Sequence, residues 1–384
     1  MKEAQYLVRT QPKWLEIDKS STKNPAIVLS QKFGLSRNIK KYPFLENSIA
    51  SEKESIYNDV LDAIKKAKIY SEEDFVEMNL LTGSNIIEML LFEKDIIPAY
   101  TMSCDWMRGA VAGMGNTAPI ILVNTKNHLD IISFCDIGNE KQTLAKLNEA
   151  DNVLGEELLY AYEPRLGFLT AKPEECGSGL WVETVVHLPA LVLLEEMTET
   201  INGLLVMGAT IQGLYNERYD AWGGFFKVMV GSFSSLDEDG IIEKTREIQN
   251  ALITAETKAR KRLFKEAKIV MEDKVFRSFG MMKYARVMPL SQLFNFMSLL
   301  RLGSEYKVIP INLKILNVLF ERGFSANLLL ASGESGSIVS PEDIDVERAN
   351  LYRFILRNIE AQMNFNEKKE KPISRKNKEE RVPF

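Results

Sequence analysis

The chain has 384 residues, which is long enough for two ordinary domains with separate hydrophobic cores. Its 45% hydrophobic and 26% charged residues are typical of a globular protein, and a net charge of −5 argues against binding nucleic acid over the whole surface. Three cysteines without zinc-site spacing and apolar runs too short to cross a bilayer predict a cytoplasmic protein with reduced thiols, without a metal site or a membrane span.

In chain order, the first half predicts alternating strands and helices. A short strand at 26–29 is expected to enter a loop, and β-rich runs predict further strands at 118–123 and 167–170. Apolar residues at helical spacing predict a helix at 51–69, and a Glu- and Lys-rich stretch predicts another at 138–159.

The second half is predicted to become mostly helical. A buried run followed by a helix is expected within 184–197, and a strand within 204–215. The charged stretch 237–275 predicts one long helix, and 291–300 and 344–359 predict two more.

These elements indicate two main units with charged ends. We expect an N-terminal extension at 1–25, an α/β domain at 26–255 and a helical domain at 256–362. The tail at 363–384 contains many charges and few apolar residues, so it is predicted to be disordered.

Three segments carry a family resemblance: IVLSQKFGLSRN at 27–38, NTKNHL at 124–129 and GFLTAKPEECGSGLWVETVVHLPAL at 167–191. In this order they resemble the ATP:guanido phosphotransferase (phosphagen kinase) family, and within it the bacterial protein-arginine kinases. Similarity continues through DIDVERANLYR at 343–353. The resemblance implies an α+β fold, with an antiparallel β-sheet flanked by helices. It also implies a helical C-terminal domain that in the arginine kinases serves dimerisation and phosphoarginine reading.

The same resemblance implies a reaction with ATP and Mg²⁺, in which arginines hold the phosphates and a glutamate acts as base. Several of these positions differ here. Lys32 and Gly34 stand where the family has two phosphate arginines, and Trp181 stands at a third such position. Lys126 occupies the base position and Lys172 the position of a reactive cysteine. Loss of one preorganised donor costs about 10²–10³ in rate, so these combined changes predict impaired catalysis.

Some residues remain candidates for ligand contact. The nucleotide-binding candidates are Lys32, His128, His187, Gln212 and Glu217, and the phosphoarginine-reading candidates are Asp345 and Arg348. Each has an alternative interpretation. The two histidines can equally be hydrogen-bonded core residues, and Asp345 with Arg348 at i, i+3 can be an ordinary helix ion pair.

The leading hypothesis is a catalytically impaired protein-arginine-kinase homologue that acts as a regulatory or binding protein. The alternative is an active phosphotransferase for protein arginines that uses Glu174, Glu175 or Glu217 as base, with ATP and Mg²⁺ as cofactors. A third possibility is a sensor that only binds nucleotide or phosphoarginine. The resemblance also implies a homodimer and partners such as a zinc-finger activator or a Clp-type protease; nucleic acid and membrane are not expected as partners.

Overall fold

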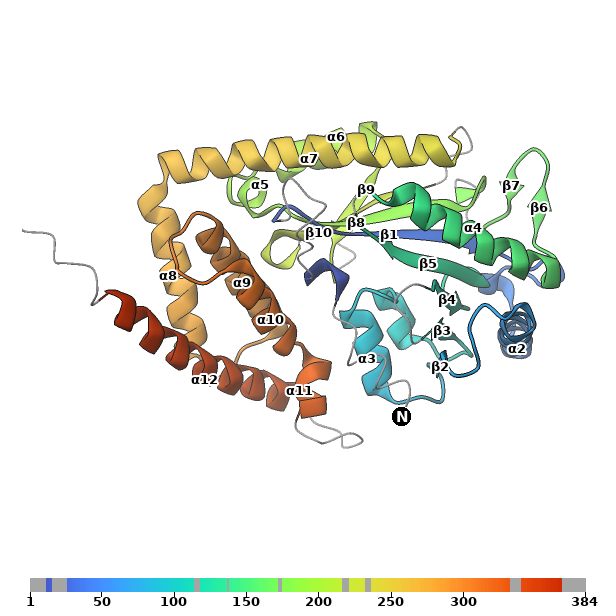
Figure 1. Cartoon of the computed structure of the whole chain (residues 1–384), viewed down its shortest axis with the longest axis horizontal. Coiled ribbons are helices and arrows are strands. Elements are labelled where there is room, and N and C mark those ends of the chain that lie inside the picture. The colour runs from blue at the N-terminus through green and yellow to red at the C-terminus, as the bar shows by residue number, and fades with distance from the viewer. Residues whose placement is uncertain are drawn as a thin grey trace, which may run out of the picture.

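One antiparallel sheet with helices around it is followed by a group of helices in the computed structural model (Figure 1). The structure describes residues 12–15, 26–113, 118–136, 138–171, 175–215, 221–231, 236–331 and 340–367. None of the described helices is long and apolar enough to span a bilayer.

The main sheet has eight strands, each antiparallel to its neighbours. In spatial order they are β2 (Phe75–Asn79), β3 (Gly109–Gly113), β4 (Ile120–Val123), β5 (Leu129–Cys135), β1 (Val28–Arg37), β8 (Leu180–His187), β10 (Phe225–Val230) and β9 (Thr210–Gly213). A separate hairpin pairs β6 (Tyr162–Glu163) with β7 (Gly167–Phe168). The predicted antiparallel α+β fold is therefore confirmed.

Strand β1 corrects the prediction that a short strand at 26–29 would enter a loop. The strand continues to Arg37 and pairs with β5 on one side and β8 on the other. Lys32 and Gly34 are poor strand formers, but this central position pairs the backbone on both sides and overrides local propensity. The first family motif therefore lies in the middle of the sheet.

Helices cover the sheet, and two of them match the predictions at 51–69 and 138–159. The helices of this part are α2 (Ala50–Ala67), α3 (Asn85–Glu93), α4 (Glu140–Glu157), α5 (Pro189–Leu193) and α6 (Met197–Val206). The strand predicted within 204–215 is reduced to β9, because α6 extends to Val206. An apolar run of that length fits either a strand or a helix.

The long helix predicted at 237–275 is instead two helices. They are α7 (Glu238–Glu266) and α8 (Lys268–Tyr284), and the chain turns at Ala267, where φ is −129° and ψ is 35°. The turn packs α8 onto α9 (Leu290–Glu305), where Gly303 leaves room for the side chain of Val275. No proline or glycine marks this turn, so the sequence pattern could not predict it.

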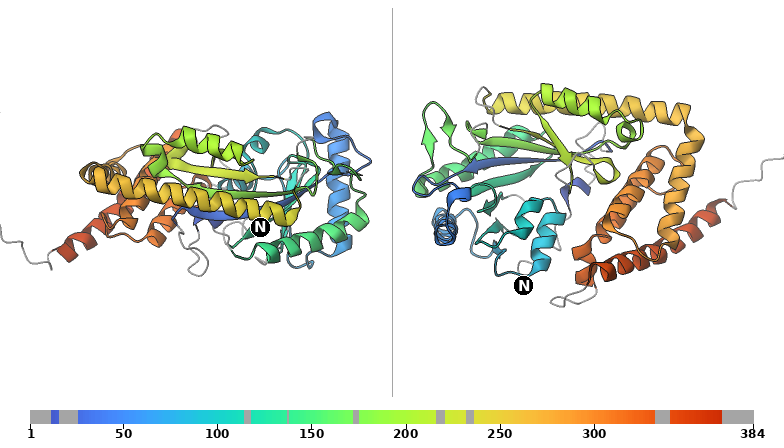
Figure 2. Two further views of the ribbon diagram at one scale, coloured as in Figure 1. Left: turned by 90° about the horizontal axis from the view of Figure 1, so that it is seen from above. Right: turned by 180° about the vertical axis from the view of Figure 1, so that it is seen from behind.

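The C-terminal helices pack around a second core, and Figure 2 shows these helices from two further sides. They are α8, α9, α10 (Leu313–Arg322), α11 (Ser325–Ala331) and α12 (Pro341–Glu367), and the predicted helices at 291–300 and 344–359 are confirmed within α9 and α12. Trp14, in the short helix η1 (Lys13–Leu15), packs in this core against Phe294, Phe320 and Phe324. The N-terminal segment therefore contributes a fully buried side chain.

Candidate functional site

Four charged side chains form a buried cluster on the central strands. Lys32 lies on β1, Glu183 opposite it on β8, Lys227 on β10, and Asp95 shortly after α3. The Lys32 ammonium is 2.7 Å from a Glu183 carboxylate oxygen and donates to the Asp95 backbone carbonyl at 2.8 Å. The Lys227 ammonium contacts the Asp95 carboxylate and lies 3.8 Å from Glu183. We call these four residues the charged cluster, in which no side chain is more than 9% exposed.

The charges of this cluster offset one another, since it contains two lysines and two carboxylates. Burial and repulsion from Glu183 raise the pKa of Asp95. Burial also opposes ionisation of Glu183, but Lys227 and Lys32 lower its pKa to about 2. Burial lowers the pKa of Lys227 less than the two carboxylates raise it. Lys32, at a phosphate-arginine position of the family resemblance, thus has its positive charge balanced by carboxylates of the protein itself.

An indole ring fills the space beside Lys32. Gly34 on β1 pairs with Trp181 on β8, and a Cβ atom at Gly34 would overlap the indole. The indole Nε1 donates to the Ser36 hydroxyl at 3.1 Å, and the Lys32 ammonium lies 5.9 Å from the ring centroid. One aromatic side chain therefore lies where the resemblance implies two arginines.

Lys126, at the position where the family resemblance implies the base, also has a partner within the chain. It lies in the turn between β4 and β5, and its ammonium is 2.5 Å from a Glu175 carboxylate oxygen. The two side chains are 35% and 33% exposed, so water screens the pair. Lys172 and Glu174, in the same segment as Glu175, lie outside the described residues.

Beneath this turn lies the buried carboxyl group of Asp130. It accepts hydrogen bonds from the hydroxyls of Ser36 at 2.5 Å and Thr125 at 3.1 Å. Burial raises the pKa of Asp130 despite these bonds. Because Ser36 also accepts from Trp181, one hydrogen-bonded chain joins the indole, the hydroxyl and the carboxyl group.

His128, a nucleotide candidate, uses both ring nitrogens in backbone contacts. Its Nδ1 accepts from the Ile39 N–H at 2.9 Å, so Nε2 carries the proton and donates to the Pro43 carbonyl at 2.8 Å. Its own backbone N–H donates to the Asn38 side chain at 3.0 Å. Burial lowers the pKa of His128 to about 4. These contacts account for a neutral histidine that ties the start of β5 to the end of β1.

Arg37 fixes the Gly-Ser-Gly turn before β8. Its guanidinium pairs with Asp151 at 2.6 Å and donates to the Ser178 carbonyl at 3.0 Å. The guanidinium also lies 3.6 Å from the Phe168 ring centroid. Gly179 has φ of +72°, and a Cβ atom there would overlap the Arg37 side chain. The glycine is therefore required by the approach of the arginine.

His187, the other histidine candidate, lies between the sheet and the C-terminal helices. Its Nε2 is 2.8 Å from the Ser298 hydroxyl on α9, and its ring stacks on Phe225 with centroids 4.3 Å apart. Burial lowers the pKa of His187 well below its ordinary range. Its contacts are those of a packed, neutral core residue.

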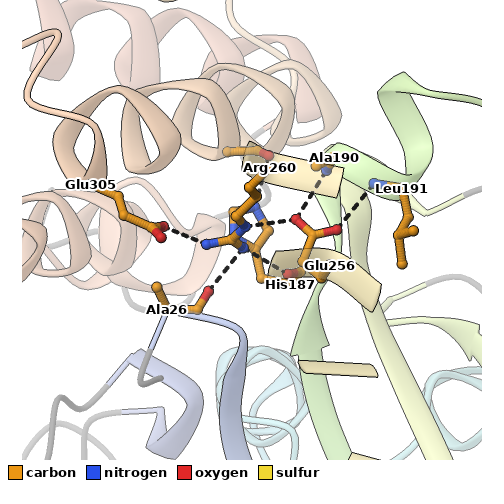
Figure 3. Close-up of polar contacts among 8 residues, drawn as sticks. Ala26, His187, Ala190, Leu191, Glu256, Arg260 and Glu305 are labelled. Atoms are coloured by element: carbon orange, nitrogen blue, oxygen red, sulfur yellow. Dashed lines mark hydrogen bonds and ion pairs between the residues drawn. The ribbon is translucent and has the colours of Figure 1, made fainter. Parts of the chain in front are cut away.

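A second buried ion network surrounds the backbone of His187 (Figure 3). Arg260 on α7 donates to the His187 carbonyl at 3.0 Å and pairs with Glu256 at 2.7 Å and with Glu305 of α9. Glu256 also accepts the first backbone N–H groups of α5, both at 3.0 Å. The network joins α5, α7, β8 and α9, and satisfies a helix start that lacks its own cap.

Arg348, a phosphoarginine candidate, is almost fully buried at α12. It donates to the carbonyls of Gly323 and Met288, each at 2.7 Å, and to the Ser325 hydroxyl at 2.8 Å. It also contacts the Asp345 carboxylate. The guanidinium thus connects α12 with the starts of α9 and α11.

The remaining candidates are less informative. Gln212 lies half-buried on the edge strand β9, and Glu217 lies outside the described residues. Sequence reasoning missed Asp95, Glu183 and Lys227. A signal was present for the last two, because a charged residue inside an apolar strand indicates a buried ion pair.

The fold places the first motif on a central strand of the sheet and is followed by a helical C-terminal part, and two family models match these two parts of the chain. Residues 55–259 match the family model described as "ATP:guanido phosphotransferase, C-terminal catalytic domain". Residues 268–369 match "Protein-arginine kinase McsB C-terminal domain". The chain belongs to the ATP:guanido phosphotransferase family.

Among curated proteins, it is similar to protein-arginine kinases. That of Clostridium novyi (strain NT) is 30% identical over 350 residues, which cover 90% of this chain and 99% of that protein. That of Pelotomaculum thermopropionicum is 28% identical over 348 residues, covering 90% and 96%. A solved structure of the duplicated taurocyamine kinase from Schistosoma mansoni, with bound transition state analog components, has a TM-score of 0.51 and 17% identity. The match covers 72% of this chain and 42% of the taurocyamine kinase chain. At this identity the likeness supports the fold alone.

Proposed function

We propose that this chain is a protein-arginine-kinase homologue with impaired phosphoryl transfer, which acts as a regulatory or binding protein. The charged cluster is the observation that carries the proposal. Phosphoryl transfer needs cations aimed at the phosphates, whereas Lys32 and Lys227 are each held by Asp95 and Glu183. A nucleotide phosphate entering this cluster would meet two carboxylates, so the residues present do not fit it.

Two further contacts support impaired transfer. Trp181 fills the space over Gly34, where the family resemblance implies arginines. Lys126 is a cation at the base position, and as an ammonium it would repel the guanidinium of an arginine substrate. Loss of several preorganised charges does not multiply simply, but little rate enhancement is expected to remain.

The proposal also includes the setting expected from the family. The protein would work in the cytoplasm as a homodimer, with protein partners of the kind that the resemblance implies. A zinc-finger activator and a Clp-type protease are the first partners to test.

Nucleotide binding and arginine phosphorylation test the proposal together. We expect isothermal titration of the full chain with Mg-ATP to give no binding heat. We also expect no acid-labile phosphate on an arginine-rich protein substrate. The Clostridium novyi protein-arginine kinase, treated identically, is the positive control. ATP-dependent phosphoarginine formed by this chain would contradict the proposal.

One contact favours the alternative of an active enzyme with an altered site. Glu175 lies 2.5 Å from Lys126 and so brings a carboxylate next to the base position. In that case ATP and Mg²⁺ would be the cofactors, and Glu175→Gln would abolish phosphorylation. The matched variant Glu163→Gln, in the β6–β7 hairpin, would leave it unchanged.

Phosphoarginine reading by Asp345 and Arg348 is a separate proposal. Asp345 is the more accessible of the two, while the Arg348 guanidinium has several protein partners. Titration with free phosphoarginine, compared between the natural chain and Asp345→Ala, tests it. Equal heats for the two proteins would rule out reading through Asp345.

A further inference from the structure

The C-terminal half of α7 carries an exposed row of lysines. Residues 250–268 contain six lysines or arginines and two glutamates, a local charge of +4 in a chain of net charge −5. Lys258, Lys261 and Lys265 are spaced i, i+3 and i+7, which places them on one helix face. Lys268 continues the row at the corner where α7 meets α8, at the upper left of Figure 1. All four are exposed, and we call them the lysine row.

The two arginines of this segment are already paired. Arg260 belongs to the buried network of Figure 3, and Arg262 contacts Glu196 of the α5–α6 turn. Within the part of the chain that the structure describes, no carboxylate lies within 4.0 Å of the Lys258, Lys261 or Lys265 ammonium. Lys268 lies 3.7 Å from a Glu272 carboxylate oxygen, so Lys258, Lys261 and Lys265 are the members of the row whose charge the fold does not offset.

We propose that the lysine row docks an acidic segment of another protein, with an apolar residue at one end of that segment. Ile269 and Val270 follow the row at the corner and are 81% and 54% exposed, which supplies the apolar contact. Lys258 and Lys265 are about 10 Å apart along the helix axis. Three to four residues of an extended chain span the same distance. The inference does not depend on whether phosphoryl transfer is lost.

Charge around the row favours a narrow protein segment over a lipid bilayer. Glu195 and Glu199 are exposed near the start of α6, beside the Glu196–Arg262 contact. An anionic bilayer would cover both regions and meet these carboxylates. An extended acidic segment can follow the lysines alone, and its attraction will fall with salt because the lysines are exposed.

Fluorescence anisotropy with the full chain tests the proposal. The probe is a labelled peptide of six glutamates followed by two leucines, and the control probe carries glutamines instead. The variant K258E/K261E/K265E is expected to bind the acidic probe about tenfold or more weakly, since three attractive pairs become repulsive. The variant K65E/K66E/K146E makes the same charge change on exposed positions of α2 and α4, and is expected to bind as the natural chain does.

Several outcomes would overturn the proposal. These are no binding of the acidic probe at about 50 mM salt, equal binding of the glutamine probe, or a loss as large in the control variant. Binding to vesicles of phosphatidylserine and phosphatidylcholine without binding to the peptide would show a lipid surface instead. Far-UV circular dichroism of both variants checks that the helices are retained. The variant Ile269→Ser/Val270→Ser is measured in the same way. It is expected to bind the acidic probe more weakly, with an unchanged salt dependence.

Discussion

Replacing Glu183 by glutamine should destabilise the fold strongly, although the side chain keeps its size. The substitution leaves Lys32 and Lys227 buried with only the Asp95 carboxylate between them. Removing one partner of a buried ion pair costs roughly 3–5 kcal/mol, because it leaves an uncompensated charge away from water. A protein of this class has only about 5–15 kcal/mol of stability in total, so the loss should be easy to measure.

Urea unfolding at pH 7, followed by circular dichroism, measures this loss as a shift of the midpoint at constant slope. The double variant K32M/E183L is the matched control, since it removes a cross-strand pair of opposite charges and leaves Lys227 with Asp95. The double variant should lose less unfolding free energy than Glu183→Gln alone, because apolar replacements of a whole buried pair are often neutral or stabilising.

A cost below about 1 kcal/mol for Glu183→Gln would show that the cluster is solvated and would refute the reasoning. So would a double variant that is less stable than the single one. The same variant also tests the anion argument. Glu183→Gln gives the cluster a net positive charge, so inorganic triphosphate should raise its melting temperature, while the natural chain should show no shift.

Three other changes test separate contacts. Gly34→Ala should lower the free energy of unfolding by roughly 1–3 kcal/mol, because the added methyl group overpacks against the indole. In a double-mutant cycle of urea unfolding, Trp181→Leu in the same chain should remove most of that loss. For His128, the folded pKa of about 4 lies below the ordinary 6.5, so its neutral form stabilises the fold above pH 6.5. About 3 kcal/mol is lost as the pH falls from 6.5 to 4, and His128→Gln should flatten the pH dependence of the unfolding free energy over that range. Arg348→Lys should cost roughly 3 kcal/mol, because lysine cannot reproduce the forked contacts to two carbonyls and a hydroxyl; an unchanged melting temperature would contradict this.

The fold could be predicted from the sequence where a local pattern matched the final contacts. Helix α2 was predictable because its apolar spacing matches the face that it buries, and α4 because its Glu- and Lys-rich stretch favours a helix. Strand β1 was predicted too short, because Lys32 and Gly34 resemble loop residues until the strands on both sides are known. The turn at Ala267 has no sequence signal, since the residues before and after it all favour a helix.

The candidate site was predictable in part, for a similar reason. The motifs indicated which positions of the family pattern had changed, but not which partners the charged residues at these positions would have. Lys32 and Asp95 are 63 residues apart, and Lys227 and Asp95 are 132 residues apart. Only the folded sheet brings these residues together, because β8 lies between β1 and β10 in space, although the three strands are far apart in sequence.

The changed positions depend on one another through these contacts. Lys32 is a suitable partner for Glu183 and Asp95 because an ammonium group can be surrounded by carboxylates on several sides. Trp181 is accommodated only because Gly34 has no side chain. An arginine at position 34 would therefore displace the indole and disturb the hydrogen bond from Trp181 to Ser36. On the pattern that the family resemblance implies, an arginine at position 34 alone would strain this packing and would leave the charged cluster around Lys32 unchanged.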